Sequence, residues 1–210
     1  MAAKKKPTDP APSSAPDPDD DNAQNVALML RTKEGDLEAF QLLVEKHQSA
    51  VIGTVAKMMG SANDAEDLAQ QVFVRVWKSA HRYEPKAKFT TWLFTITRNL
   101  VFNESRKRYR KSEVSMDAHE ETYHVSTPDD DTIQPDDAAL QQELVTAIDA
   151  AIQKLPEKQR MAVILRRYED MPYEEIGKIL KLSLPAVKSL LFRARADLRK
   201  HLQSYLDAEE

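Results

Sequence analysis

Positive charge gathers at the end of the stretch from Phe89 to Lys111. The first half of this stretch is apolar and aromatic, whereas the second half is basic. Its basic side chains are Arg106, Lys107, Arg108, Arg110 and Lys111. Guanidinium and ammonium groups donate to phosphate oxygens, while an apolar half can pack against a protein core. The stretch therefore predicts a helix that is packed at one end and lies on nucleic acid at the other.

A second basic helix is predicted near the C-terminus, over residues 184–202. Its inward face is formed by apolar residues at helical spacing, namely Val187, Leu191, Ala194 and Leu198. The side chains that point away from this face are Lys188, Ser189, Phe192 and Arg193. A short amphipathic helix and a tight turn precede it, which is the pattern of a helix-turn-helix that reads base edges of DNA.

No arrangement typical of catalysis or of metal binding appears in the sequence. The chain has no cysteine and no glycine-rich phosphate loop. Its histidines are scattered without the spacing of a metal-binding pair: His47, His81, His119, His124 and His201. We therefore expect no enzyme activity, no catalytic residue, no metal, no cofactor and no small-molecule substrate.

Charge is segregated along the chain, although the net charge is only −4. Residues 26–111 carry 15 basic and 9 acidic side chains, and residues 144–210 carry 12 and 10. Between them, residues 112–143 carry 10 acidic side chains and neither lysine nor arginine. The two basic parts favour a polyanionic partner, whereas the acidic connector repels DNA.

Helical periodicity without alternating strands predicts an all-α fold of two small helical domains joined by a flexible acidic linker. Residues 1–25, rich in Pro, Ser and Asp, are expected to be a disordered extension. The domains are placed at 26–111 and 140–206, with the linker at 112–139. No stretch is long and apolar enough to cross a membrane, so we expect a cytoplasmic protein without direct membrane insertion.

Local signals also predict where helices begin and end in the first domain. Asp36 is expected to cap a helix that Gly60 closes. His47 falls on the apolar face of that helix and is expected to pack inward.

Four segments together resemble the extracytoplasmic-function (ECF) sigma factors of RNA polymerase, which belong to the sigma-70 family. They are DAEDLAQQVFVRVW, FTTWLFTITRNLVFNESRKR, LPEKQRMAVILRRYEDMPYEEIGKIL and LSLPAVKSLLFRARADLRKHL, and they occur in the family's order. The resemblance covers about residues 26–110 and 140–202. It implies that the first domain is sigma domain 2, which binds core RNA polymerase and opens the −10 promoter element. The second would be sigma domain 4, which binds the −35 element of promoter DNA.

The resemblance also assigns residues to each surface. The polymerase-binding set is Asp67, Gln70, Phe73 and Trp77. The −10 set is Arg98, Asn99 and Asn103, to which the basic block adds Arg106, Lys107 and Arg108. The −35 set is Lys188, Ser189, Phe192 and Arg193. The chain departs from the family's usual residues at Gln71, Lys181 and Leu190, where Glu, Gly and Arg are frequent. Family membership further implies an anti-sigma factor as a partner.

A free-standing helix-turn-helix regulator that binds duplex DNA as a dimer is the alternative function. A sigma factor directs initiation only with core polymerase, whereas such a regulator binds its site without it. The linker fits a sigma factor, since 29 residues (111–139) reach about 95 Å when extended and about 30 Å as a coil. Promoter elements one to two helical turns apart lie about 35–70 Å from each other.

Overall fold

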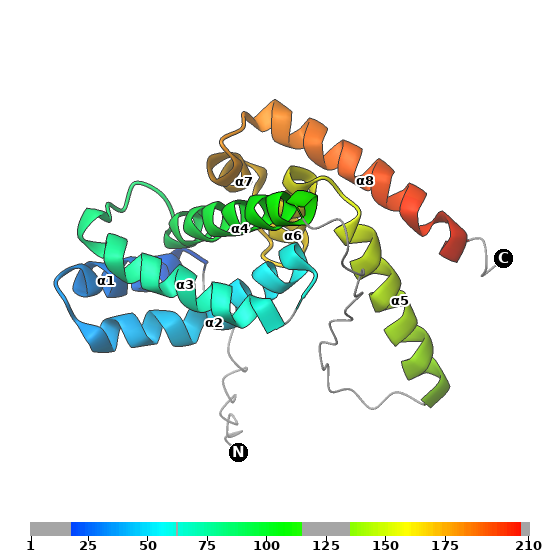
Figure 1. Cartoon of the computed structure of the whole chain (residues 1–210). Helices are drawn as coiled ribbons and strands as arrows, with labels where there is room; N and C mark the ends of the chain where they lie inside the picture. Colours follow the sequence, from blue (N-terminus) through cyan, green and yellow to red (C-terminus); the bar gives the residue numbers. More distant parts are fainter. Residues whose placement is uncertain (1–17, 62, 115–134, 207–210) are drawn as a thin grey trace, which may run out of the picture.

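The computed structural model describes residues 18–61, 63–114 and 135–206. Within these ranges the chain forms α-helices and one 3₁₀ turn but no β-strand (Figure 1). The first domain consists of α1 (Pro18–Lys33), α2 (Leu37–Met59), α3 (Asn63–Ser79), η1 (Ala80–Arg82) and α4 (Phe89–Val114). The second domain consists of α5 (Pro135–Gln153), α6 (Glu157–Arg167), α7 (Tyr173–Leu180) and α8 (Leu184–Leu206). The prediction of an all-α fold with two helical domains is confirmed.

Both ends of α2 are set by local capping. Asp36 precedes the helix, and its Oδ1 accepts a hydrogen bond from the Ala39 N–H at 3.0 Å. At the other end Gly60 adopts a left-handed conformation with φ of 71°, and its N–H donates to the Ala56 carbonyl at 2.9 Å. Glycine adopts this conformation without the steric cost that a side chain adds. Both ends lie where the sequence predicts them.

The first helix begins earlier than the sequence indicates. Composition places residues 1–25 in a disordered extension, but α1 starts at Pro18. Asn22 Oδ1 accepts from the first backbone N–H of α4 at 3.0 Å, and the buried Asn25 lies 3.2 Å from His47 Nε2. The expected boundary after residue 25 is therefore wrong, because these polar side chains are hydrogen-bonding partners inside the domain.

Helix also extends into both ends of the expected linker. The sequence places the linker over 112–139, whereas α4 runs to Val114 and α5 begins at Pro135. The rest of the expected linker and residues 1–17 lie outside the described residues.

One apolar core runs through both domains. In the first domain its largest fully buried side chains include Met29, Leu43, Phe89, Leu93 and Phe94. In the second domain they include Met161, Ile164, Leu165 and Ile176. The core is continuous because α7 packs along α4, while α5 and α6 pack against α2 (Figure 1).

The turn between α7 and α8 is tight. Lys181 ends α7 in the left-handed region, with φ of 56°, and the Leu182 N–H donates to the Gly177 carbonyl at 2.9 Å. A Cβ at Gly177 would lie 2.8 Å from the Leu182 carbonyl oxygen, so only glycine allows this close approach. The turn orients α8 relative to α7. No helix among the described residues has the length and apolar character needed to span a membrane.

Candidate nucleic-acid and protein interfaces

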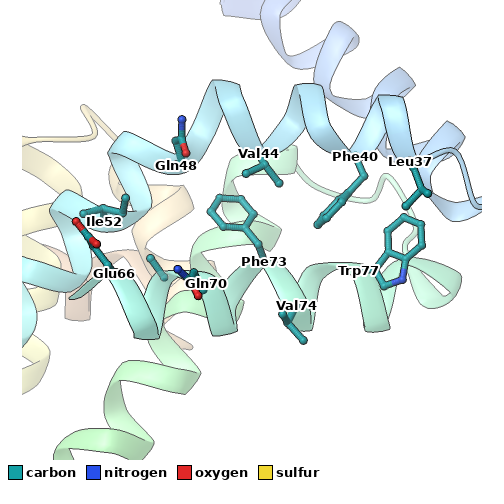
Figure 2. A pocket seen from close by; sticks show the side chains of 11 residues that line it. Leu37, Phe40, Val44, Gln48, Ile52, Glu66, Gln70, Phe73, Val74 and Trp77 are labelled. Atoms are coloured by element: carbon teal, nitrogen blue, oxygen red, sulfur yellow. The ribbon is translucent and has the colours of Figure 1, made fainter. Parts of the chain in front are cut away.

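An apolar groove of about 740 Å³ lies between α2 and α3 (Figure 2). It is lined by Leu37, Phe40, Val44, Gln48, Ile52, Glu66, Ala69, Gln70, Phe73, Val74 and Trp77. The residues from each helix recur at spacings of three and four, so they share one face. The Phe40 and Trp77 rings meet across the groove, with centroids 5.1 Å apart.

The groove exposes more apolar surface than a packed helix pair requires. Leu37 is 67% exposed and Val74 is 51% exposed. Contiguous exposed apolar surface of this kind marks a site for another protein rather than for solvent. Gln70 and Glu66 place polar groups at the groove, so a bound helix could be held by hydrogen bonds as well as by packing.

The structure places three of the four residues in the expected polymerase-binding set in this groove. Gln70, Phe73 and Trp77 line it, whereas Asp67 is exposed on α3 and lies outside the lining. The contribution of α2 to the groove is not predicted from the sequence, which indicates only that this helix has one apolar face. Leu43 is fully buried, but Leu37 faces the groove. The unusual width of the α2 stripe is the signal that could have indicated two faces.

A polar stripe runs along the second half of α4. Asn99, Asn103, Arg106 and Arg110 follow one another at spacings of four, three and four, and all are exposed. Lys107 is exposed beside them and lies 3.4 Å from Glu104. Carboxamides can donate to and accept from base edges, and the arginines can bind phosphates. This stripe therefore has the side chains for a nucleic-acid surface.

Arg108 lies on the opposite side of α4 from the stripe. Its Nη2 is 2.8 Å from Asp64 Oδ2 on α3, and its Nε is 3.7 Å from Glu104. The hydrogen bond from Arg108 lowers the pKa of Asp64 below its ordinary value. The structure thus does not bring Arg108 together with the other members of the expected −10 set.

Arg98 faces the second domain. Its Nε donates to the Ile179 carbonyl of α7 at 3.2 Å, and its Nη1 donates to Asn99 Oδ1 at 2.6 Å. The guanidinium also lies 5.3 Å from the centre of the Phe102 ring. Burial lowers the pKa of Arg98, which remains a cation at neutral pH. Two of the guanidinium nitrogens of Arg98, Nε and Nη1, therefore donate hydrogen bonds within the protein.

The helix-turn-helix presents the expected −35 set to solvent. Lys188, Ser189 and Arg193 are exposed, and Phe192 is 69% exposed. The opposite face of α8 is anchored by Val187, Ala194 and Leu191, all of them buried. Leu190, one of the departures from the family's usual residues, is also buried and belongs to the anchored side.

Few other groups in the structure suggest chemistry. In the described part of the chain, no group of three or more histidine or carboxylate side chains is placed to hold a metal ion. In the described part of the chain, most of the expected site residues lie on three surfaces: the α2–α3 groove, the α4 stripe and the exposed face of α8.

Comparison with known proteins identifies the family to which the chain belongs. The model of Sigma-70 region 2 matches residues 43–111, and that of Sigma-70 region 4 matches residues 146–198. The chain is 32% identical over 177 residues to the ECF RNA polymerase sigma factor SigW of Bacillus subtilis, covering 82% of this chain and 94% of that protein. The chain is an ECF sigma factor of the sigma-70 family.

Further relatives agree with this assignment. The sigma factor is 32% identical over 188 residues to the RNA polymerase sigma-H factor of Pseudomonas aeruginosa, covering 87% of this chain and 96% of that protein. Because both region 2 and region 4 match, a free-standing helix-turn-helix regulator is not favoured.

Solved structures share the fold of this sigma factor. CnrH in complex with the cytosolic domain of CnrY is 24% identical, with a TM-score of 0.63 over 89% of this chain and 99% of that chain. The sigma factor RpoE of Bartonella quintana, in complex with the anti-sigma factor NepR, is also 24% identical. Its TM-score is 0.65 over 78% of this chain and 96% of that chain.

Proposed function

We propose that this sigma factor binds core RNA polymerase through the groove between α2 and α3 and binds promoter DNA through α4 and α8. Sigma factors are non-enzymatic regulators that recognise the −35 and −10 elements and help open the DNA for initiation. The exposed apolar groove is the observation that carries the proposal, because neither DNA nor the rest of the chain needs such a surface. The site of action is the cytoplasm, where the polymerase works.

The groove suits a helical partner. Trp77 offers aromatic surface along α3, the 9% exposed Phe73 lies at the base of the groove, and Gln70 offers a side-chain amide one turn from Phe73. The apolar residues of an amphipathic helix or coiled coil would fill the groove at positions three and four apart. In the ECF sigma factors that this chain resembles, the corresponding surface docks on the clamp coiled coil of the largest polymerase subunit. Asp67 at the edge would then make a charged contact from outside the groove.

The α4 stripe suits the −10 element. Asn99 and Asn103 can bond to the edges of bases that have left the stack, and Arg106 can hold the adjoining phosphates. Unstacking costs a few kcal/mol per base, so strand opening depends on contacts that only the open strand makes. The stripe offers such contacts side by side on one rigid helix.

The exposed face of α8 suits the −35 element. Arg193 can bond to a guanine edge in the major groove, and Lys188 can contact phosphate. The buried side of α8 fixes the rotation of the helix, so these side chains are presented in a defined order. An anti-sigma factor is a further expected partner, since the Bartonella RpoE that shares this fold is bound to one in its structure.

Val74→Glu tests the groove. Val74 is exposed in the free protein, so the substitution should leave the fold intact while placing a charge where an apolar partner surface must bind. We expect the variant to lose comigration with core polymerase in gel filtration and to lose run-off transcription. Leu30→Glu is the matched control, because Leu30 is 41% exposed on α1 and lies outside the groove. Unchanged polymerase binding by Val74→Glu would rule out this docking site.

A further inference from the structure

A cleft of about 430 Å³ lies between the second half of α4 and the start of α6. The side chains that line it are Ser105, Arg106, Tyr109, Arg110, Glu157 and Arg160. The four from α4 recur at spacings of three and four, so one face of this helix forms one wall. The two from α6 are three positions apart and form the other wall. The volume of the cleft lies within the range of small-molecule sites in proteins.

The wall formed by α4 carries positive charge that is not paired. Arg106 and Arg110 are exposed, and neither forms an ion pair or a hydrogen bond with another side chain that the structure describes. Burial lowers the pKa of Arg98 on the same helix, and the charge of Arg106 lowers it too. Cations that lie close enough to affect one another favour an anion beside them.

Arg160 adds a third cation from the other wall. Its Nη1 donates to the Met58 carbonyl at 2.7 Å and to Gln153 Oε1 at 2.9 Å, and its Nη2 donates to the carbonyls of Leu155, at 3.2 Å, and Gln153. All of these acceptors are uncharged, and burial lowers the pKa of Arg160. An anion in the cleft would offset the cost of burying this charge. Because the guanidinium is already fixed, little side-chain freedom is lost when the anion binds.

Glu157 is the only carboxylate in the lining. Its Oε1 is buried and has no hydrogen-bond partner among the described residues. The negative charge of Glu157 raises the pKa of Arg98 and of Arg160, so it acts on both without forming an ion pair with either. Three cations and one carboxylate leave the cleft positively charged. A ligand with several negative charges is therefore favoured over a single carboxylate.

Tyr109 gives the cleft an aromatic surface. It is 68% exposed, so the fold does not use this ring as core. An exposed ring beside cations is a surface on which a nucleobase stacks while the cations hold its phosphates. The hydroxyl of Ser105 can donate a further hydrogen bond to a phosphate oxygen. The lining thus offers partners for both parts of a nucleotide.

The two proposed DNA surfaces do not account for this cleft. The −10 surface uses Asn99, Asn103 and Arg106, and the −35 surface lies on α8. Tyr109 belongs to neither set, and Arg160 comes from a domain whose DNA surface is on another helix. The side chains that remain point to a separate ligand.

We propose that the cleft between α4 and α6 binds a free nucleoside polyphosphate, with its phosphates among the three arginines and its base on Tyr109. This site goes beyond the binding of polymerase and promoter. Because Arg106 is shared with the −10 surface, Tyr109 and Arg110 are the residues that test the site.

Calorimetric titration of the full-length protein with ATP tests the ligand class. We expect saturable binding at one site. Inorganic tripolyphosphate, which has the charge but no base, should bind about fivefold or more weakly than ATP. Adenosine, which has the base but no charge, should not bind at the same concentrations. Absence of saturable ATP binding, or equal affinity for tripolyphosphate, would overturn the proposal.

Tyr109→Ala separates stacking from charge. The ring is exposed, so its removal should leave the fold intact. The affinity for ATP should fall about fivefold or more, which is the loss of one stacked base, and the affinity for tripolyphosphate should stay the same. Equal changes for both ligands, or no change for ATP, would contradict the stacking of a base on this ring.

Arg110→Gln tests the phosphate contact. It should weaken the binding of ATP and of tripolyphosphate about tenfold, because a charged hydrogen bond is lost. Arg75→Gln is the matched control, since Arg75 is exposed on α3 and lies outside the lining. Glu157→Gln should instead strengthen ATP binding, and a gain of affinity cannot come from misfolding. Equal weakening by Arg110→Gln and Arg75→Gln would reduce the binding to general attraction and overturn the proposal.

A fluorescein-labelled single-stranded DNA pool of random sequence distinguishes a free nucleotide from DNA. If the protein binds the pool but not ATP, and Arg110→Gln weakens binding of the pool, the cleft is part of the DNA surface and the proposal is wrong. Loss of the proposed function would show separately, as failure of the unchanged protein to comigrate with core polymerase.

Discussion

His47 shows how a polar side chain is accommodated inside the first domain. It is 7% exposed, with Nε2 near Asn25 and its ring 5.1 Å from that of Phe89. Burial, together with a smaller effect of the charge of Lys46, lowers the pKa of His47 from 6.5 to about 4, although Asp21 opposes the shift. The sequence correctly predicts that His47 packs inward, because its position follows from helical periodicity alone.

The pKa of His47 predicts acid sensitivity of the fold. Between pH 6.5 and about 4 the unfolded chain binds a proton at His47 that the folded chain does not. Stability should therefore fall as the pH drops through this range, by at most about 3 kcal/mol. Between about pH 7 and about pH 5, the melting temperature of the His47→Gln variant should fall less than that of the unchanged protein. Equal losses in thermal denaturation would contradict this.

Lys181 is a residue whose backbone conformation suits glycine better. Its φ of 56° lies in the left-handed region, where a side chain adds strain. We expect Lys181→Gly to stabilise the protein by about 1 kcal/mol in urea denaturation. Lys178→Gly, inside α7, should instead destabilise it by a similar amount, about 1 kcal/mol. If both substitutions shift stability in the same direction, the strain at position 181 is not significant.

At the scale of the elements, sequence patterns predict which face of a helix is buried better than they predict which helices pack against it. The caps of α2 and the two faces of α8 follow from local signals, and the structure agrees with them. The start of α1 does not, because Asn22 caps α4 at a separation of 67 positions. Helical periodicity likewise places Arg108 on α4 without indicating that Asp64 of α3 lies beside it. Local patterns carry no information on which helix packs against which.

The two sides of α4 should respond differently to substitution. Arg106→Ala removes a cation from the stripe, so DNA affinity should fall and the salt dependence of binding should weaken by about one phosphate contact. Arg108→Ala removes the ion pair with Asp64 on the other side, where both groups are partly exposed. It should cost less than about 1 kcal/mol of stability and leave DNA affinity unchanged. Fluorescence anisotropy of labelled DNA across a salt series measures the DNA affinity of both variants. Equal effects of the two substitutions on affinity would contradict the division of α4 into two sides.

At the scale of the whole molecule, the contact between the two domains is the feature that the sequence predicts least. Its contacts join helix-end carbonyls to Gln153 and Arg160 across about half the chain. Backbone carbonyls leave no mark in the sequence, and neither donor differs from an ordinary polar surface residue. The two domains, by contrast, follow from the segregation of charge and from helical periodicity. The sequence thus predicts the two helical domains, and the structure shows how they pack against each other.

Gly60 takes part both in the end of α2 and in the contact between the two domains. It ends α2 with a positive φ, and a Cβ there would lie 3.0 Å from Gln153 Oε1. A side chain at this position would therefore disturb the end of the helix and press on the second domain together. A substitution at position 60 should therefore weaken the end of α2 and the packing of Gln153 against it in a single step.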